Sequence, residues 1–133
     1  GGYIAHLLSK HAGSSVFFKG SIVAYANIIK EELLDVPHET LITVGAVSKE
    51  TVTQMVQEVR VKMNSDYAIA VSGIMGPGGA TAEKPVGMVW IAVASKASTV
   101  VKEFHFRFDR ERNIGLTAIN ALNLLRQMIV DNR

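Results

Sequence analysis

A tyrosine, an asparagine and a lysine lie close together just after an apolar run. Tyr25, Asn27 and Lys30 stand where a predicted strand at residues 21–25 passes into a predicted helix. Apolar residues flank Lys30, and a lysine that is partly buried beside apolar groups loses its proton more easily and can act as a base. The same pattern also fits a surface lysine whose methylene stem covers apolar surface.

A segment rich in glycine and proline, GIMGPGGATAEKP, occupies residues 73–85. It follows a nearly continuous apolar run at residues 67–72, which is typical of a buried strand. Ligands of open α/β sheets bind beyond the carboxyl ends of strands, and glycines expose N–H groups that bind phosphate. The segment matches neither the P-loop nor the GxGxxG fingerprint, and its glycines also suit a plain connection. Its candidate ligand-binding residues are Ser72, Gly73, Gly76, Pro77 and Gly78.

Two further positions have side chains suited to anions. Arg110 lies in a charged run at residues 109–112 that opens the last predicted helix, and an arginine there can hold a phosphate or carboxylate with two hydrogen bonds. The run also fits an ordinary cluster of surface charges at a helix start. Ser14 follows Gly13 in a predicted loop, where it can bind an anion or cap the next turn.

Composition excludes several classes of protein. Apolar residues make up 48% of the 133 residues, which is enough for one packed core, and the net charge is only +2, without the basic stripe of a dedicated nucleic-acid binder. No apolar run approaches the roughly 20 residues that span a bilayer. There are no cysteines, and the four histidines show no metal-ligand spacing, so we expect no metal and no other cofactor. The absence of cysteine also fits a reducing compartment, and we expect a cytoplasmic protein.

The positions of apolar residues and turn formers predict alternating helices and strands. Helices are expected at residues 3–10, 28–34, 49–63 and 109–130, with Asn27 and Ser48 as N-caps and a loop marked by Pro37 after the helix at 28–34. Strands are expected at residues 21–25, 67–72, 87–94 and 99–108. We predict a single domain over residues 1–133. Its predicted class is α/β: a three-layer α/β/α sandwich with a central mixed, largely parallel sheet that includes one hairpin.

Taken together, the sequence resembles the C-terminal domain of the CinA family. The resemblance rests on blocks in the order found in that family, and it runs from the first residue almost to the last. These blocks are GG (residues 1–2), GSS (13–15), VAYANIIK (23–30), GAVS (45–48), SGIMGPGG (72–79), EKPVGMVW (83–90) and DRE (109–111).

The resemblance implies an amidohydrolase. Enzymatic members of the family hydrolyse the carboxamide of nicotinamide mononucleotide to nicotinate mononucleotide and ammonia, with a serine nucleophile, a lysine base and no metal. That serine belongs to a Glu-Ser-Cys-Thr-Gly-Gly motif, and Gly1 and Gly2 look like its last two residues. The serine is therefore expected three positions before Gly1, together with the strand that leads to it, and we expect the chain alone to be inactive.

Carried over by motif, Lys30 is the base and Tyr25 supports the proton transfer or orients the serine–lysine pair. Arg110 holds the nucleotide phosphate or assists the polar network of the site. The expected substrate-binding residues are Asn27, Ser14, Ser72, Gly73, Gly76, Pro77 and Gly78. The sequence departs from the family at Met75, where alanine is common, and at Phe108, where glycine is common. Both departures lie beside the expected site.

Two other hypotheses compete with the hydrolase. The family includes two-domain proteins linked by name to competence and DNA damage, so the pocket can belong to a noncatalytic nucleotide-binding or regulatory module. Direct DNA binding is disfavoured by the small net charge. We expect a small-molecule nucleotide as the partner, no nucleic acid and no membrane, and self-association into a homo-oligomer.

Overall fold

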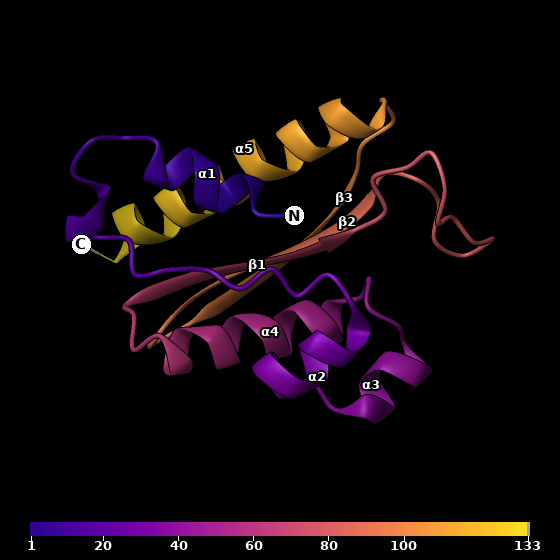
Figure 1. Cartoon of the computed structure of the whole chain (residues 1–133), viewed down its shortest axis with the longest axis horizontal. Helices are drawn as coiled ribbons and strands as arrows, with labels where there is room; N and C mark the ends of the chain where they lie inside the picture. The colour runs from indigo at the N-terminus through magenta and orange to yellow at the C-terminus, as the bar shows by residue number, and fades with distance from the viewer. Residues whose placement is uncertain (133) are drawn as a thin grey trace.

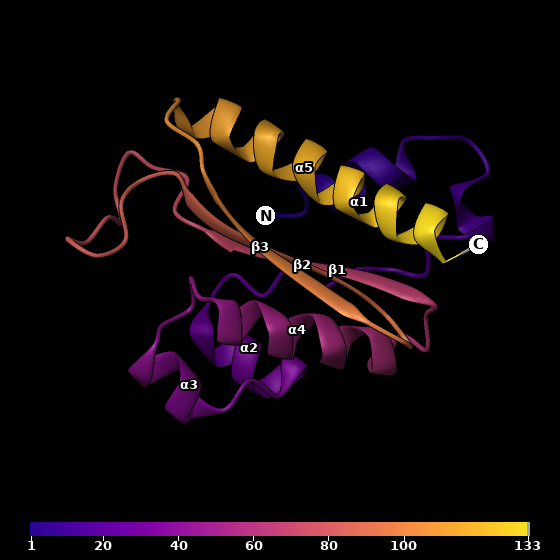
Figure 2. The ribbon, with the colours of Figure 1, turned by 180° about the vertical axis from the view of Figure 1, so that it is seen from behind.

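The computed structural model describes residues 1–132 and has three layers (Figure 1). Helices α1 (Tyr3–Ser9) and α5 (Arg110–Asp131) lie together on one face of a β-sheet, and the view from behind shows the same arrangement (Figure 2). The other face is covered by α4 (Lys49–Lys62), with α2 (Asn27–Leu34) and α3 (His38–Thr43) packed against α4, while a short 3-10 helix, η1 (Ser14–Val16), follows α1. The predicted α/β/α sandwich is therefore confirmed.

The sheet differs from the prediction in the direction of its strands. It contains β1 (Tyr67–Gly73), β2 (Met88–Ser95) and β3 (Thr99–His105) in that spatial order, and both pairs are antiparallel. The prediction of a largely parallel sheet was wrong, whereas the hairpin is present. No helix separates consecutive strands, and parallel neighbours need a long crossover connection that this part of the chain does not supply.

The predicted strand at residues 21–25 does not form part of the sheet. The segment runs as an extended stretch past β1, but the backbone hydrogen bonds of the described residues do not join it to any strand (Figure 1). Its alternation persists nonetheless, because Ile22 and Ala24 pack on the core while Val23 and Tyr25 are 52% and 74% exposed. The pattern correctly predicted the buried face, but a strand also requires a hydrogen-bonded neighbour.

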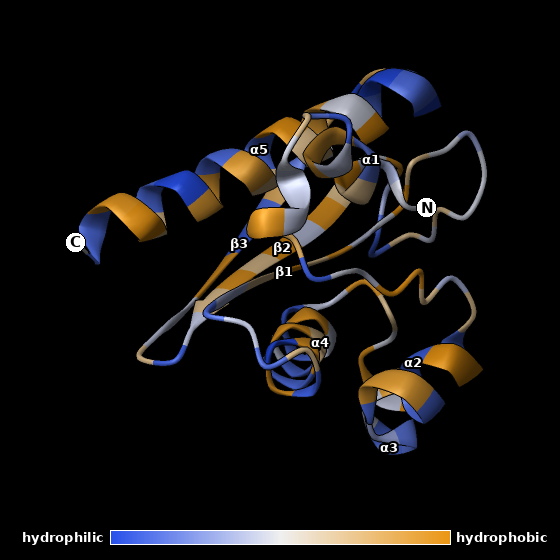
Figure 3. Ribbon diagram, turned by 60° about the vertical axis from the view of Figure 1, so that its left-hand side comes forward, coloured by the Kyte–Doolittle hydropathy of each residue, from blue (hydrophilic) through white to orange (hydrophobic). Residues whose placement is uncertain are grey.

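Strand β2 separates two apolar clusters. Val89, Ile91 and Val93 pack on one side with residues of α5, and Ala92 and Ala94 pack on the other side with residues of α4. A strand covered on both faces requires a continuous apolar run, which is what the sequence provides here. Figure 3 shows the complementary pattern in α5, whose length alternates between apolar and polar bands.

Helix starts account for most of the remaining differences. Ser48 caps α4 as predicted, with its Oγ accepting a hydrogen bond from the Thr51 backbone N–H at 3.2 Å. Asn27 is not an N-cap: Ala26 holds that position and Asn27 is the first residue of α2. Pro37 lies in the short loop after α2, as predicted, but it also precedes the helix α3, which the sequence pattern did not predict.

The glycine just before β2 generates the first prediction. Gly87 has φ of 90°, and a Cβ there would overlap the carbonyl of Phe106. We expect Gly87→Ala to lower the free energy of unfolding by about 2 kcal/mol or more. Gly115 has open space around it within α5, so the matched Gly115→Ala should raise the same quantity by up to about 1 kcal/mol. Urea unfolding measures both, and equal midpoints for the two variants would contradict the packing argument.

Candidate functional site

Lys30 is a buried lysine without an acidic partner. Only 6% of its surface is exposed, and its Nζ donates hydrogen bonds to the carbonyl oxygens of Ala24 at 2.6 Å and Tyr25 at 3.5 Å. No salt bridge within residues 1–132 includes it. Burial lowers the pKa of the Lys30 amine from its ordinary value, because desolvation disfavours the charged form.

The position of Lys30 follows from the local fold. Leu34, one turn later in α2, is also buried, so both side chains lie on the helix face that packs against the domain. The helix begins immediately after the extended segment, and the lysine therefore reaches back to the carbonyls of that segment. The apolar residues around Lys30 in the sequence left burial and a surface position both open, and the structure shows the side chain buried.

Arg110 joins the other two parts of the predicted site. Its Nη2 donates to the Tyr25 hydroxyl at 3.2 Å, and its Nη1 donates to the carbonyl oxygen of Gly76 at 2.8 Å. The first residue of α5 thus ties the corner before α2 to the glycine-rich loop. Because Lys30 binds the backbone of Tyr25 while Arg110 binds its hydroxyl, these three predicted residues form one cluster.

Sequence reasoning missed Asn113, whose side-chain amide holds the backbone on either side of this cluster. It is fully buried, and its Nδ2 donates to the carbonyls of Met75 and Phe108, both at 3.0 Å, while its Oδ1 accepts from the Phe108 N–H at 3.1 Å. These bonds hold the loop residue before Gly76 and the turn before α5. The available signal was a polar residue four positions before Thr117 on the buried face of a helix.

The predicted loop residues divide into two groups. A Cβ at Gly73 would lie 2.7 Å from Val89 Cγ2, and one at Gly76 would lie 2.6 Å from Val86 Cγ1, so close packing accounts for both glycines. Ser72 is half-buried in β1. Pro77 and Gly78 are exposed, and a Cβ at Gly78 would meet nothing within 4 Å. Only the second group presents a free backbone to a ligand.

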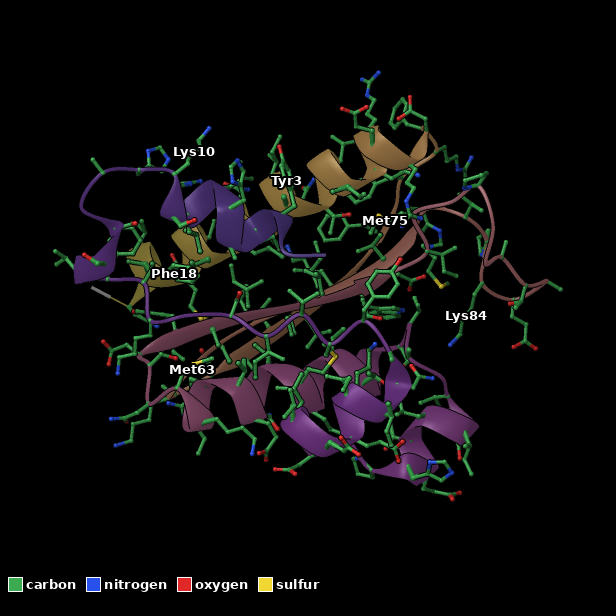
Figure 4. All side chains as sticks on the ribbon, viewed as in Figure 1. Tyr3, Lys10, Phe18, Met63, Met75 and Lys84 are labelled. Carbon is green, nitrogen blue, oxygen red and sulfur yellow. The ribbon has the colours of Figure 1, made fainter. Side chains whose placement is uncertain are left out.

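Two predicted residues stand apart from the cluster. Ser14 belongs to η1, near Phe18, whereas Met75 adjoins the cluster at the other end of the sheet (Figure 4). The Ser14 Oγ donates a hydrogen bond to the carbonyl of Ser9 at 3.4 Å, so the hydroxyl binds the backbone of its own segment. Asn27 is exposed at the start of α2. A substrate-binding role for either residue stays a prediction.

The beginning of the chain lies beside the segment that leads to Lys30. Gly2 precedes α1 with φ of 87°, and a Cβ there would lie 3.6 Å from Val23 Cγ2 (Figure 1). Val23 is two residues before Tyr25, so the expected glycine pair of the serine motif packs near the corner that carries the lysine.

Arg110 brings a positive charge to the site without an acidic partner. Its guanidinium donates to the Gly76 carbonyl and the Tyr25 hydroxyl. The salt bridges found within residues 1–132 involve other residues: His38–Glu31, Lys62–Asp35 and His105–Glu103. Carbonyl dipoles do not cancel a full charge, so this region favours an anionic ligand.

Residues 1–132 contain neither a cluster of metal ligands nor a membrane-spanning helix. No three His, Cys, Asp or Glu side chains come together in a group that could hold a metal ion. None of the helices in this range has the length and apolar character needed to cross a membrane.

Comparison with known proteins gives consistent results. The sequence model of the CinA C-terminal domain matches residues 1–129. The CinA-like protein of Cytophaga hutchinsonii is 49% identical over 129 residues, and that of Thermosipho melanesiensis is 47% identical over 131 residues. Each match covers 97% of this chain but only 31% and 33% of the relative, so the chain spans about a third of the length of these curated relatives.

Solved structures agree with the sequence matches. The competence/damage inducible protein CihA from Agrobacterium tumefaciens has a TM-score of 0.94 at 38% identity, over 100% of this chain and 80% of that chain. The competence damage-inducible protein A from Klebsiella pneumoniae also has a TM-score of 0.94, at 32% identity over 98% of this chain and 81% of that chain. This chain therefore belongs to the CinA C-terminal domain family.

Proposed function

We propose that this domain, within its full-length protein, is an amidohydrolase that converts nicotinamide mononucleotide to nicotinate mononucleotide and ammonia. The observation that supports the proposal is the burial of Lys30 without a carboxylate beside it. Such a lysine is more easily neutral near physiological pH than a lysine in water, and only a neutral amine can accept a proton.

The proposed reaction needs a serine hydroxyl, which the resemblance places three positions before Gly1. The Lys30 amine takes the hydroxyl proton as the serine oxygen attacks the carboxamide carbon. The resulting tetrahedral intermediate loses ammonia as the C–N bond breaks and the lysine returns the proton to the leaving nitrogen. A water molecule, deprotonated by the same amine, then hydrolyses the ester to release nicotinate mononucleotide and the serine.

Tyr25 and Arg110 are proposed to position these groups and the substrate. Lys30 is held to the backbone on either side of Tyr25, so the tyrosine fixes the corner that delivers the amine. Arg110 donates one hydrogen bond to the Tyr25 hydroxyl and one to the Gly76 carbonyl. Its other N–H groups suit the phosphate of the mononucleotide.

A noncatalytic nucleotide-binding module is the second candidate. The observation that favours it is Arg110, whose guanidinium has a hydroxyl and a carbonyl but no salt bridge within residues 1–132, which suits an anionic nucleotide whether or not a nucleophile is present. The two candidates differ in turnover and not in binding.

The direct test is ammonia release from the mononucleotide by the full-length protein, including every residue encoded before Gly1. We expect Lys30→Ala to lower kcat by about 10²–10⁴-fold, because general-base catalysis is lost. Lys62→Ala is the matched control, since Lys62 pairs with Asp35 on the exposed face and should keep the parent rate. A near-parent rate for Lys30→Ala rejects the lysine as base. Tight binding without turnover by the parent supports the noncatalytic module instead.

The lowered pKa of Lys30 also makes stability depend on pH in a defined direction. Between the lowered folded pKa and the unfolded value of 10.5, the unfolded chain binds more protons than the folded chain. The free energy of unfolding of the parent should therefore rise with pH across that window, relative to Lys30→Met, which lacks the amine. Urea unfolding of both proteins from neutral pH to about 10.5 measures the difference. A difference that stays constant or falls with pH would show that the amine is not desolvated.

A further inference from the structure

The loop between β1 and β2 is held to the rest of the domain both near its start, where Asn113 also binds the Met75 carbonyl, and near its end. Near its start, the carbonyl of Gly76 accepts a hydrogen bond from Arg110 at 2.8 Å. Near its end, the Lys84 Nζ donates to the carbonyl of Val44, forty residues earlier in the chain. Every residue from 77 to 83 is exposed, so the part of the loop between these contacts projects away from the sheet (Figure 1). Only the contacts near its start belong to the site described above.

The Lys84 ammonium group lies in a small recess, here called the seat, formed by Val44 and Gly45. Val44 is the C-cap of α3, and carbonyls at the C-terminal end of a helix carry partial negative charge that suits a cation. The next residue, Gly45, has φ of 80°, and a Cβ there would lie 3.0 Å from Lys84 Nζ. A side chain at that position would therefore crowd the ammonium group, which glycine admits.

Both sides of this contact are held in place. On the loop, Thr81 N–H donates to the Lys84 carbonyl at 2.9 Å, and Lys84 N–H donates to Thr81 Oγ1 at 3.1 Å. On the domain, the Gly45 carbonyl accepts from Ser48 Oγ at 2.9 Å and Thr51 Oγ1 at 2.7 Å, which ties the seat to the start of α4. Figure 4 shows the Lys84 side chain reaching from the loop toward the helical layer.

We propose that Lys84 is a positioning residue that holds the Gly/Pro-rich loop in a fixed position next to the nucleotide site. The proposal rests on the proposed function, and Lys84 acts through the loop without touching the reacting atoms. A loop already ordered before binding spares the substrate the entropic cost of ordering it, so loss of the contact weakens substrate binding more than it slows the chemical step.

The first test measures the loop itself in the full-length protein. Hydrogen exchange of peptides covering residues 74–87 should become about tenfold faster in Lys84→Met, because the loop loses the side-chain contact near its end. Peptides from α4 and β2 should exchange as in the parent. Lys84→Arg, which keeps the donor, should restore slow exchange, and Lys96→Met, which removes an exposed lysine from the turn between β2 and β3, is the control. Unchanged loop exchange in Lys84→Met overturns the proposal.

The second test separates positioning from general stability through kinetics. We expect the KM of Lys84→Met for nicotinamide mononucleotide to rise about tenfold, which is about 1.4 kcal/mol, with kcat within about threefold of the parent. The pH at which kcat rises should not move, because Lys30 is untouched. Lys84→Arg should recover most of the KM. Faster loop exchange with an unchanged KM overturns the positioning role.

The outcomes also distinguish this proposal from the proposed function. If the parent releases no ammonia, the hydrolase fails, and the dissociation constant of the same mononucleotide, measured by calorimetry, replaces KM. Weaker binding by Lys84→Met than by Lys96→Met then supports the positioning role, and equal binding rejects it. A parent that neither binds nor hydrolyses the mononucleotide rejects both.

Discussion

The site depends on an amine that is taken out of water without a carboxylate to neutralise it. Lys30 binds the carbonyls of Ala24 and Tyr25, which solvate an ammonium less well than water does. A salt bridge at this position would stabilise the charged form and remove the basicity that a proton acceptor needs. The fold supplies dipoles instead, and the result is a lowered pKa at a fixed location. The apolar packing of α2 on the domain offsets the free-energy cost of desolvating the Lys30 amine.

The rest of the cluster is assembled by the last helix. Arg110 reaches both the Tyr25 hydroxyl and the Gly76 carbonyl, and Asn113, one turn later, holds the loop and the preceding turn through its amide. A single rigid element thereby sets the distance between two segments that are about fifty residues apart in the sequence. Preorganisation of this kind keeps the donors oriented before a ligand arrives.

The family departures are absorbed by local packing. Met75 joins the apolar cluster beneath α5, with its sulfur 3.9 Å from Thr117 Oγ1, while its carbonyl accepts from Asn113. Phe108 lies half-exposed at the turn before α5, where the Arg112 guanidinium stacks 4.1 Å from its ring centre. Neither side chain displaces the hydrogen bonds that join Arg110 to Gly76 and Tyr25.

Local pattern was sufficient for the three layers and the capping serine of α4, because each depends on the residues nearest in sequence. For Lys30 it left burial and a surface position both open. It failed for the strand direction and for residues 21–25, because pairing depends on which distant segment supplies the hydrogen bonds. It also failed to single out Asn113 and Lys84, whose partners lie 38 and 40 residues away. Spacing along a chain fixes which face of an element is apolar, whereas only the folded chain decides which remote carbonyl a polar side chain meets.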